Sequence, residues 1–150
     1  MTEADLKDKF LVRAYRDGDF EGITRFWDLT GMGTPERGDN KEIIENTIKI
    51  GGTLLVVEEK DTGKISGTSW MTFDGRRILL HHFGILPEFQ GKGLSKILLT
   101  ESLQFVKSKG HQVKLEVHST NFKAINLYKK FGFRHLGEYN VYIIRDLSNL

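Results

Sequence analysis

The sequence predicts an α/β domain with a mixed, mostly antiparallel central sheet of six to seven strands, flanked by about four helices. Apolar residues first recur at helical spacing, then alternate in three β-prone segments joined by tight turns, and a strand–helix–strand unit follows. Antiparallel strands followed by such a unit make a mixed sheet. We expect one domain over residues 1–150 with the element order β-α-α-β-β-β-α-β-α-β(-β).

The first third of the chain is predicted to hold one strand and two helices. Residues 10–15 alternate and are β-prone, which predicts the first strand. Asp19 is placed to cap a helix that runs to Thr30. A loop rich in glycine and charge, residues 31–40, leads to a second helix whose apolar residues recur at helical spacing (Ile43, Ile44 and Ile48).

The middle of the chain is predicted to be an antiparallel meander. Strands are expected at residues 53–57, 65–73 and 78–85, with turns at Asp61-Thr62-Gly63 and Asp74-Gly75 between them.

The last third returns to helical periodicity. A long amphipathic helix is expected at residues 91–109, then a strand at 113–117 and a helix at 122–131. Gly132 has the position of a glycine that ends a helix. Residues 133–147 are expected to finish the domain as two strands or one bent ribbon.

Composition excludes several classes of function. The chain has no cysteine, which excludes disulfides, thiolate metal sites and an acetyl-cysteine intermediate. No apolar run is long enough to span a membrane, and the polar N-terminus lacks the apolar region of a secretory signal, so we expect a cytoplasmic protein. A net charge of +2 is too small to indicate nucleic-acid binding.

Charge is unevenly distributed. Residues 1–60 carry 13 acidic against 9 basic side chains, and residues 61–150 carry 7 against 13. A polyanionic ligand would favour the second segment and a cationic one the first, although solvated faces can differ in this way by chance.

A glycine-rich turn between an expected strand and a long helix is the densest motif (Ile85-Leu86-Pro87-Glu88-Phe89-Gln90-Gly91-Lys92-Gly93-Leu94-Ser95-Lys96). Free backbone N–H groups and the helix dipole favour anions at such a helix start, and glycine allows a pyrophosphate to approach the backbone. Neither the Walker A spacing nor the dinucleotide fingerprint fits. A plain strand-to-helix turn is the alternative.

A second block runs from residue 115 to residue 133. Alternation puts Lys114, Glu116 and His118 on the face of a strand opposite its apolar residues, where they line either a cleft or solvent. On the helix that follows, Tyr128 is either a core or rim aromatic or a functional side chain.

Together the two blocks resemble the GNAT superfamily of N-acetyltransferases over nearly the whole chain. The pattern Q/R-x-x-G-x-G/A is matched by Gln90 and Gly93, with Ser95 where glycine or alanine is usual. The pattern N-x-x-A-x-x-L-Y-x-x-x-G-F is matched at every position (Asn121, Ala124, Leu127, Tyr128, Gly132 and Phe133).

The resemblance implies acetyl-CoA as the acyl donor and no metal. It implies that backbone groups at Phe83, Gly84 and Ile85 hold the pantetheine arm, with the Phe83 N–H polarising the acetyl carbonyl. Asn121 would contact the pantetheine, and Tyr128 would lie against the thioester sulfur and donate a proton. The glycine turn would hold the pyrophosphate (Gln90, Gly91, Lys92, Gly93, Leu94, Ser95 and Lys96).

The base that takes the amine's proton is open between a glutamate, one of two histidines and a water relay. Ribosomal-protein alanine N-acetyltransferases use a glutamate in an L-E-V-x-x-x-N-x-x-A segment, and Glu116 occupies that place. His81 and His82 compete with it, and strand alternation sends only one of them toward any site. We prefer Glu116.

The acceptor is expected to be a small cationic amine or amino-acid derivative. The loop before the second helix, and that helix, supply carboxylates in a region that shapes the family's acceptor site (Glu36, Asp39, Glu42 and Glu45). The alternatives are a peptide or protein amine, which the short segment after Phe133 and its separated Tyr139 and Tyr142 make less favoured, and a non-catalytic CoA-binding sensor. A homodimer is an open alternative to a monomer.

Overall fold

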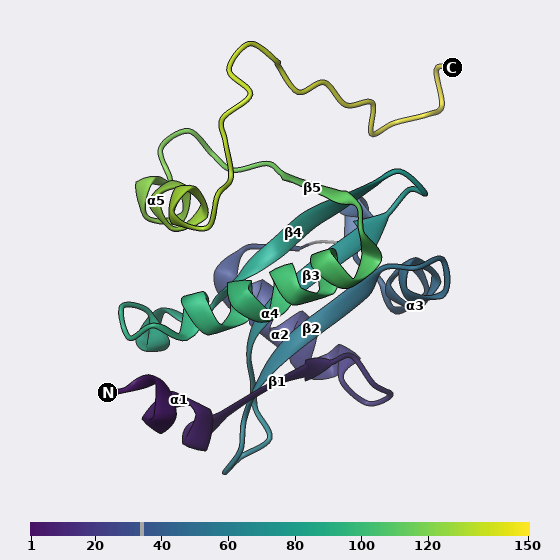
Figure 1. Ribbon diagram of the computed structural model, residues 1–150. Coiled ribbons are helices and arrows are strands. Elements are labelled where there is room, and N and C mark those ends of the chain that lie inside the picture. The colour runs from purple at the N-terminus through teal and green to yellow at the C-terminus, as the bar shows by residue number, and fades with distance from the viewer. Residues whose placement is uncertain (34) are drawn as a thin grey trace. The chain divides into compact units, whose positions relative to one another are not determined.

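A five-stranded mixed sheet organises residues 1–116 (Figure 1). The computed structural model describes residues 1–33 and 35–150, in two units, Met1–Glu116 and Val117–Leu150. The sheet order is β1-β2-β3-β4-β5, with antiparallel pairing throughout except that β5 runs parallel to β4. The strands are β1 (Phe10–Ala14), β2 (Thr53–Glu59), β3 (Ile65–Phe73), β4 (Arg77–Ile85) and β5 (Gln112–Leu115).

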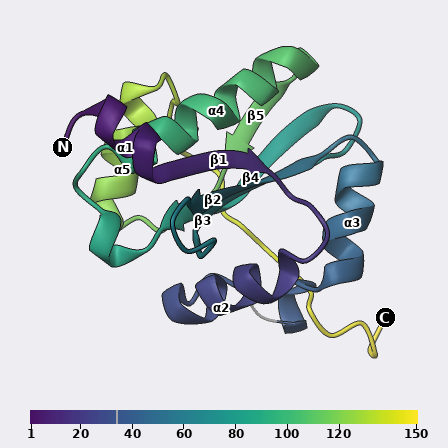
Figure 2. The same ribbon diagram turned by 90° about the horizontal axis from the view of Figure 1, so that it is seen from below.

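Helices cover both faces of this sheet (Figure 2). On one face lie α2 (Phe20–Thr30) and α3 (Lys41–Lys49), and on the other lie α1 (Glu3–Lys9) and α4 (Leu94–Lys109). Short 3-10 helices, η1 (Pro35–Arg37) and η2 (Pro87–Phe89), precede α3 and α4. No helix in the described residues combines the length and the apolar character needed to cross a bilayer.

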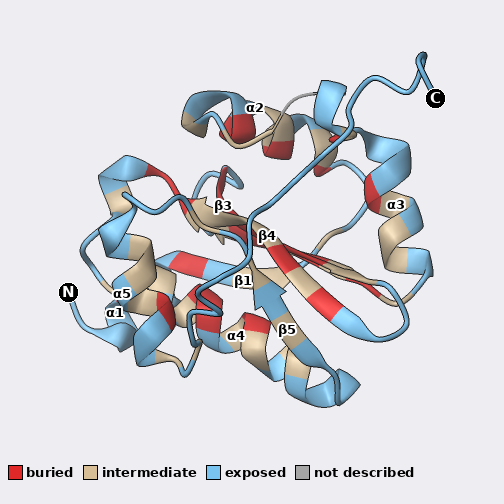
Figure 3. Ribbon diagram, turned by 90° about the horizontal axis from the view of Figure 1, so that it is seen from above, coloured by how far each residue is buried: buried red, intermediate tan, exposed pale blue. Residues whose placement is uncertain are grey.

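Each face has its own apolar core, and buried positions concentrate on the middle strands (Figure 3). Trp27 of α2 and Ile44 of α3 pack with Trp70 of β3 on one face. Leu6 of α1 and Leu98 of α4 pack over the other face. The sheet is thus fixed from both sides.

Helix α1 was not expected from the sequence. Thr2 and Asp5 form a capping box, in which the N–H of Asp5 donates to the Thr2 hydroxyl and the N–H of Thr2 donates to the Asp5 carboxylate. Leu6 supplies the apolar anchor and is 2% exposed. The capping pattern and this single leucine were the available signals in a polar N-terminus.

The second unit, described by itself, contains α5 (Phe122–Lys130). Asn121 caps the helix, and Gly132 follows its end with φ 96°, which confirms the expected C-terminal glycine.

The predicted strands at residues 133–147 are wrong, since the structure describes no strand there. Local bonds such as Glu138 N–H to the Leu136 carbonyl occur instead, and the apolar side chains are largely exposed. A β-prone segment needs a neighbouring strand to form a ladder, which propensity alone does not supply. The sheet therefore has five strands instead of six to seven.

Asp19 stands at the start of α2, but its side chain does not cap the helix. Its carboxylate instead accepts two hydrogen bonds from the Arg13 guanidinium, both 2.8 Å, and one from the Arg16 N–H. Arg13 also donates to Glu58 on β2. A buried arginine thus ties β1 to α2 and β2. Burial opposes the charge on Asp19, yet the bonds from Arg13 and Arg16 outweigh it and lower the pKa of this carboxyl.

We predict that Asp19→Asn lowers the free energy of unfolding at pH 7 by about 1–3 kcal/mol, because a nearly buried charge pair loses one partner. Since the folded-state pKa is depressed, the wild-type stabilisation is present above the ordinary carboxyl pKa and is lost as pH falls through the folded value. Urea unfolding at several pH values measures this. Exposed Asp17→Asn is the matched control, and an Asp19→Asn penalty that stays constant down to strongly acid pH would contradict the prediction.

Candidate active site

A β-bulge interrupts β4 near its end. Thr68 on β3 lies opposite Gly84, while Trp70, two residues on, lies opposite His81, so β4 contains one extra residue between these pairs. His82 sits in the bulge with φ 47° and is the sole non-glycine residue with positive φ in the described chain. Backbone in this region is uncommon for a residue with a Cβ atom, although histidine is enriched there.

The bulge places both histidine rings beside the same pair of tryptophans. His81 stacks on Trp70 with ring centroids 4.7 Å apart, and His82 lies 4.7 Å from Trp27. The two Nδ1 atoms are 3.2 Å apart. The expectation that alternation would separate the two side chains is therefore wrong, because the left-handed His82 backbone breaks the alternation.

Asp39 reaches this pair from the loop before α3. Its Oδ1 lies 3.1 Å from Nε2 of His82, and both side chains are largely buried. Of the four carboxylates expected at an acceptor site, Glu36 and Glu42 are exposed and Glu45 lies 3.9 Å from Lys41. Of these four carboxylates, Asp39 lies beside the histidines, as the charge partner of His82.

Burial is the main cause that lowers the pKa of His81 to about 4, with a further decrease from His82 and a partial increase from Asp39. His81 is therefore neutral near pH 7. The contact between the two Nδ1 atoms can be donated by either ring, and the Nε2 atoms of both histidines are buried without a hydrogen-bond partner among the described residues.

The glycine turn follows β4 after the short 3-10 helix η2. Gly91 and Gly93 have φ of 77° and 97°, and Gly93 is the residue before the first turn of α4. The amide of Gln90 donates to the Ile85 carbonyl at 3.4 Å, which folds the turn back on the strand end. Because glycine has no side-chain oxygen, it cannot cap the first N–H groups of α4. The turn has the backbone that an anion site requires.

Lysines flank this turn and the start of α4. Lys92 lies over the Phe89 ring at 5.9 Å, and Lys96 is exposed. A groove of about 180 Å³ between α1 and α4 is lined in part by Lys7, Lys92 and Lys96, and also by Glu3 and Glu101. Lys7 pairs with Glu3 at 2.9 Å, so Lys92 and Lys96 are the cations that flank the turn.

The pairing of β4 with β5 ends before the bulge. Parallel pairing with β5 ends where Leu80 lies opposite Leu115, and β4 continues to Ile85 beyond that point. The expected pantetheine contacts Phe83, Gly84 and Ile85 all lie in this stretch. A Cβ atom on Gly84 would meet the terminal methyl of Met32, whose flexible side chain packs on the strand here. The structure thus brings the expected residues of β4 and of the turn together in one unit.

The remaining expected site residues divide between the two units. Glu116 follows β5 and is exposed, like Lys114 before it. In the second unit, the side-chain Oδ1 of Asn121 accepts from the Ala124 N–H at 3.3 Å. Tyr128 is buried and packs edge-on to Phe133, and burial raises its pKa to about 12. Its hydroxyl is therefore protonated at neutral pH.

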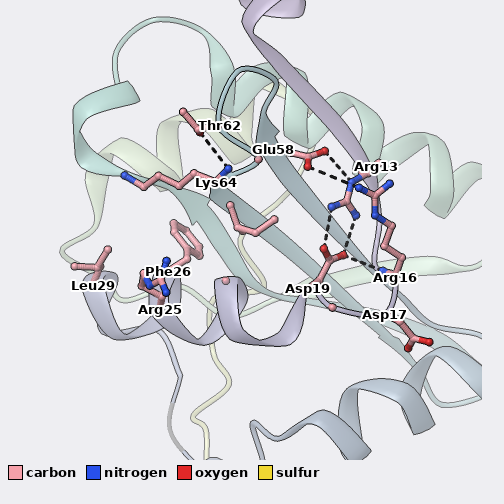
Figure 4. Close-up of a pocket in the computed structure, with 14 residues that line it drawn as sticks. Arg13, Arg16, Asp17, Asp19, Arg25, Phe26, Leu29, Glu58, Thr62 and Lys64 are labelled. Atoms are coloured by element: carbon pink, nitrogen blue, oxygen red, sulfur yellow. Dashed lines mark hydrogen bonds and ion pairs between the residues drawn. The ribbon is translucent and has the colours of Figure 1, made fainter.

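A cavity of about 500 Å³ lies elsewhere in the first unit (Figure 4). It is lined by residues of β1, α2 and the β2–β3 hairpin. Figure 4 shows Arg13 between Asp19 and Glu58 at its side. Since Arg13 is fully engaged by these carboxylates, we assign its charge to the stability of the fold.

Sequence reasoning did not identify Trp27, Thr68 or Trp70 as neighbours of the site. Each resembles an ordinary core residue in its segment. The signal that could have found them is the bulge itself, which residue spacing does not reveal.

The chain matches a known protein family and several solved structures. The profile of the acetyltransferase (GNAT) family matches residues 24–133. Among solved structures, AAC(6')-Iy in complex with the bisubstrate analogue CoA-S-monomethyl-acetylneamine has a TM-score of 0.72 at 15% identity, covering 91% of this chain and 99% of that one. A GNAT family acetyltransferase from Elizabethkingia anophelis with acetyl-CoA bound has a TM-score of 0.61 at 18% identity, covering 85% and 77%. The ribosomal-protein-S18-alanine N-acetyltransferase from Escherichia coli has a TM-score of 0.69 at 16% identity, covering 83% and 77%.

We predict that His81 titrates with a pKa of about 4 in the folded protein. The unfolded state then binds more protons between pH 6.5 and 4, so stability is complete above the unfolded pKa and falls as pH drops through this window. Asp39→Asn should lower the His81 pKa further, because the carboxylate raises it. NMR titration of the imidazole resonances measures both effects, and a His81 that titrates near 6.5 would refute the assignment.

Proposed function

Because the chain belongs to the GNAT family of acetyltransferases, we propose that it moves the acetyl group of acetyl-CoA to a primary amine by direct attack in a ternary complex. The family makes the chain an acyl-CoA N-acyltransferase with acetyl-CoA as donor. The observation that carries the proposal is the β4 bulge followed by the Gly91–Gly93 turn, which together offer backbone donors for a thioester carbonyl and a pyrophosphate. The absence of cysteine supports direct transfer over an acetylated enzyme.

Acetyl-CoA is proposed to bind at the residues that the sequence predicts for it. The turn from Gln90 to Lys96 takes the pyrophosphate, with the open start of α4 and nearby lysines supplying positive potential. Residues 83–85 take the pantetheine arm. Asn121 is proposed as a further pantetheine contact, although its side-chain oxygen also caps α5.

The chemistry requires one proton to leave the amine and one to reach the sulfur. A lysine-like amine has a pKa near ~10.4 and must be neutral to attack. Its nitrogen forms a C–N bond with the carbonyl carbon, the C–S bond breaks, and CoA leaves as a thiol. Tyr128, whose raised pKa keeps its proton at neutral pH, is proposed as the acid that protonates the sulfur.

Glu116 is proposed as the base on the resemblance alone. It is exposed and directly follows the last residue of β5. The His81–His82 pair is the competing base, supported by its position at the bulge and by the lowered pKa that keeps His81 neutral near pH 7.

A small cationic amine or amino-acid derivative is the proposed acceptor, supported by the acidic balance of residues 1–60. Of the carboxylates predicted at the acceptor site, Asp39 is buried beside His82, whereas Glu36 and Glu42 are exposed. A peptide or protein amine is the alternative substrate, and a CoA-binding sensor is the alternative class. A cytoplasmic location and a homodimer stay predictions.

We predict that acetyl-CoA and CoA bind the purified protein in isothermal titration and that one class of amine triggers thiol release from acetyl-CoA. Tyr128→Phe should reduce kcat by about 10²–10⁴-fold, because the leaving thiolate loses its proton donor, while acetyl-CoA affinity is kept. Tyr139→Phe, at a position 82% exposed, is the matched control.

Three results would count against parts of this proposal. Binding without thiol release from any amine would favour the sensor class. Failure of both ligands to bind would reject the donor assignment. Unchanged turnover in Tyr128→Phe would remove the tyrosine from the acid role.

A further inference from the structure

His82 adopts a conformation that its surroundings must maintain. Its φ of 47° lies in the left-handed region, which costs free energy for any residue with a Cβ atom. Such residues persist where neighbouring groups over-determine the backbone. Two residues outside β4 constrain His82 here: Thr68 contacts its carbonyl and Asp39 contacts its ring.

The carbonyl of His82 is held by a buried chain of hydrogen bonds. Thr68 Oγ1 donates to it at 2.6 Å, and Trp27 Nε1 donates to Thr68 Oγ1 at 3.0 Å. Thr68 is fully buried and Trp27 is 2% exposed, so neither bond competes with bulk water. The carbonyl is thereby directed toward β3 and α2.

The ring of His82 is held by Asp39, with 3.1 Å between Oδ1 and Nε2. Asp39 immediately precedes Asn40, whose side chain accepts from the Ile43 N–H and caps α3. The start of α3 therefore fixes where the carboxylate lies. The titratable groups that act on this cluster in the described residues are His81, His82 and Asp39.

The direction of the His82 carbonyl determines the direction of the Phe83 N–H. Both belong to one peptide unit, which is planar and trans, and the described chain contains no cis peptide bond. In a trans unit the C=O and N–H bonds point opposite ways. Since the carbonyl points at Thr68 on β3, the Phe83 N–H points away from β3, toward the side where β5 has already left β4 after Leu80.

We propose that Thr68 and Asp39 are positioning residues that hold His82 in its left-handed conformation and so direct the Phe83 N–H at the acetyl carbonyl of acetyl-CoA. This inference rests on the proposed function, which gives that N–H its role. It adds that the Phe83 N–H is oriented by two residues outside β4, Thr68 on β3 and Asp39 in the loop before α3. Without these contacts, the peptide unit can rotate and the bulge can relax toward an ordinary strand.

The test compares the affinities of acetyl-CoA and CoA, which differ by the acetyl group alone. Thr68→Val should weaken acetyl-CoA binding by about threefold to tenfold, the effect of one hydrogen bond, and leave CoA binding unchanged. Thr68→Ser keeps the hydroxyl and should keep the wild-type ratio of the two Kd values. Isothermal titration measures all four values without any acceptor.

Asp39→Asn should shift the ratio in the same direction as Thr68→Val, and exposed Asp28→Asn is its matched control. In a His82→Gly background the left-handed backbone needs no clamp, so Asp39→Asn should have no further effect. Circular dichroism and thermal unfolding confirm that each variant is folded.

Folded Thr68→Val and Asp39→Asn variants with the wild-type ratio would overturn the positioning role and leave the acetyltransferase proposal intact. Equal losses for acetyl-CoA and CoA would also overturn it, because they would indicate a general structural effect. If neither ligand binds the wild type, both proposals fall together.

Discussion

The hydrogen bond from Thr68 to the His82 carbonyl joins the two strands at the point where their regular pairing fails. It is short, 2.6 Å, and it depends on a close approach of β3 and β4. Gly67 permits that approach, since a Cβ atom there would lie 2.8 Å from the Gly84 carbonyl oxygen and 3.0 Å from a Val57 methyl. The bulge, the orientation of its peptide unit and the gathering of both imidazoles follow from this arrangement.

Strand β3 supports the two halves of the proposed donor site from opposite faces. Thr68 faces α2 and holds the bulge, while its neighbour Ser69 faces α4 and shares a buried 2.7 Å hydrogen bond with Ser102. Small residues at this contact let α4 lie close to the sheet. The helix whose first turn follows Gly93 and the strand that carries the bulge are therefore positioned by adjacent residues of one strand.

Local signals predicted the elements well wherever one segment determines its own structure. The meander with its Asp74-Gly75 turn, the amphipathic α4 and the capped α5 agree with the expected ranges within a few residues. The glycine turn was also found, because positive φ at Gly91 and Gly93 has a direct sequence signature.

Features that depend on distant partners were missed. Asp19 has the usual identity of a helix cap, yet Arg13 on β1 binds its carboxylate. Strand alternation predicts that the two histidine side chains separate, but the bulge between the Thr68–Gly84 and Trp70–His81 pairs overrides it. The β-prone segment after Phe133 has no described neighbouring strand, so its propensity is not expressed.

The stack beside the bulge also gives this protein an intrinsic optical reporter. The chain contains two tryptophans, and both belong to it, with Trp27 and Trp70 at 5.6 Å from each other and each against an imidazole. All of the indole emission therefore originates within one contact shell of His81 and His82. When excitation selects tryptophan over the four tyrosines, the fluorescence of these two indoles thus reports on rearrangement of this cluster, with no dye attached.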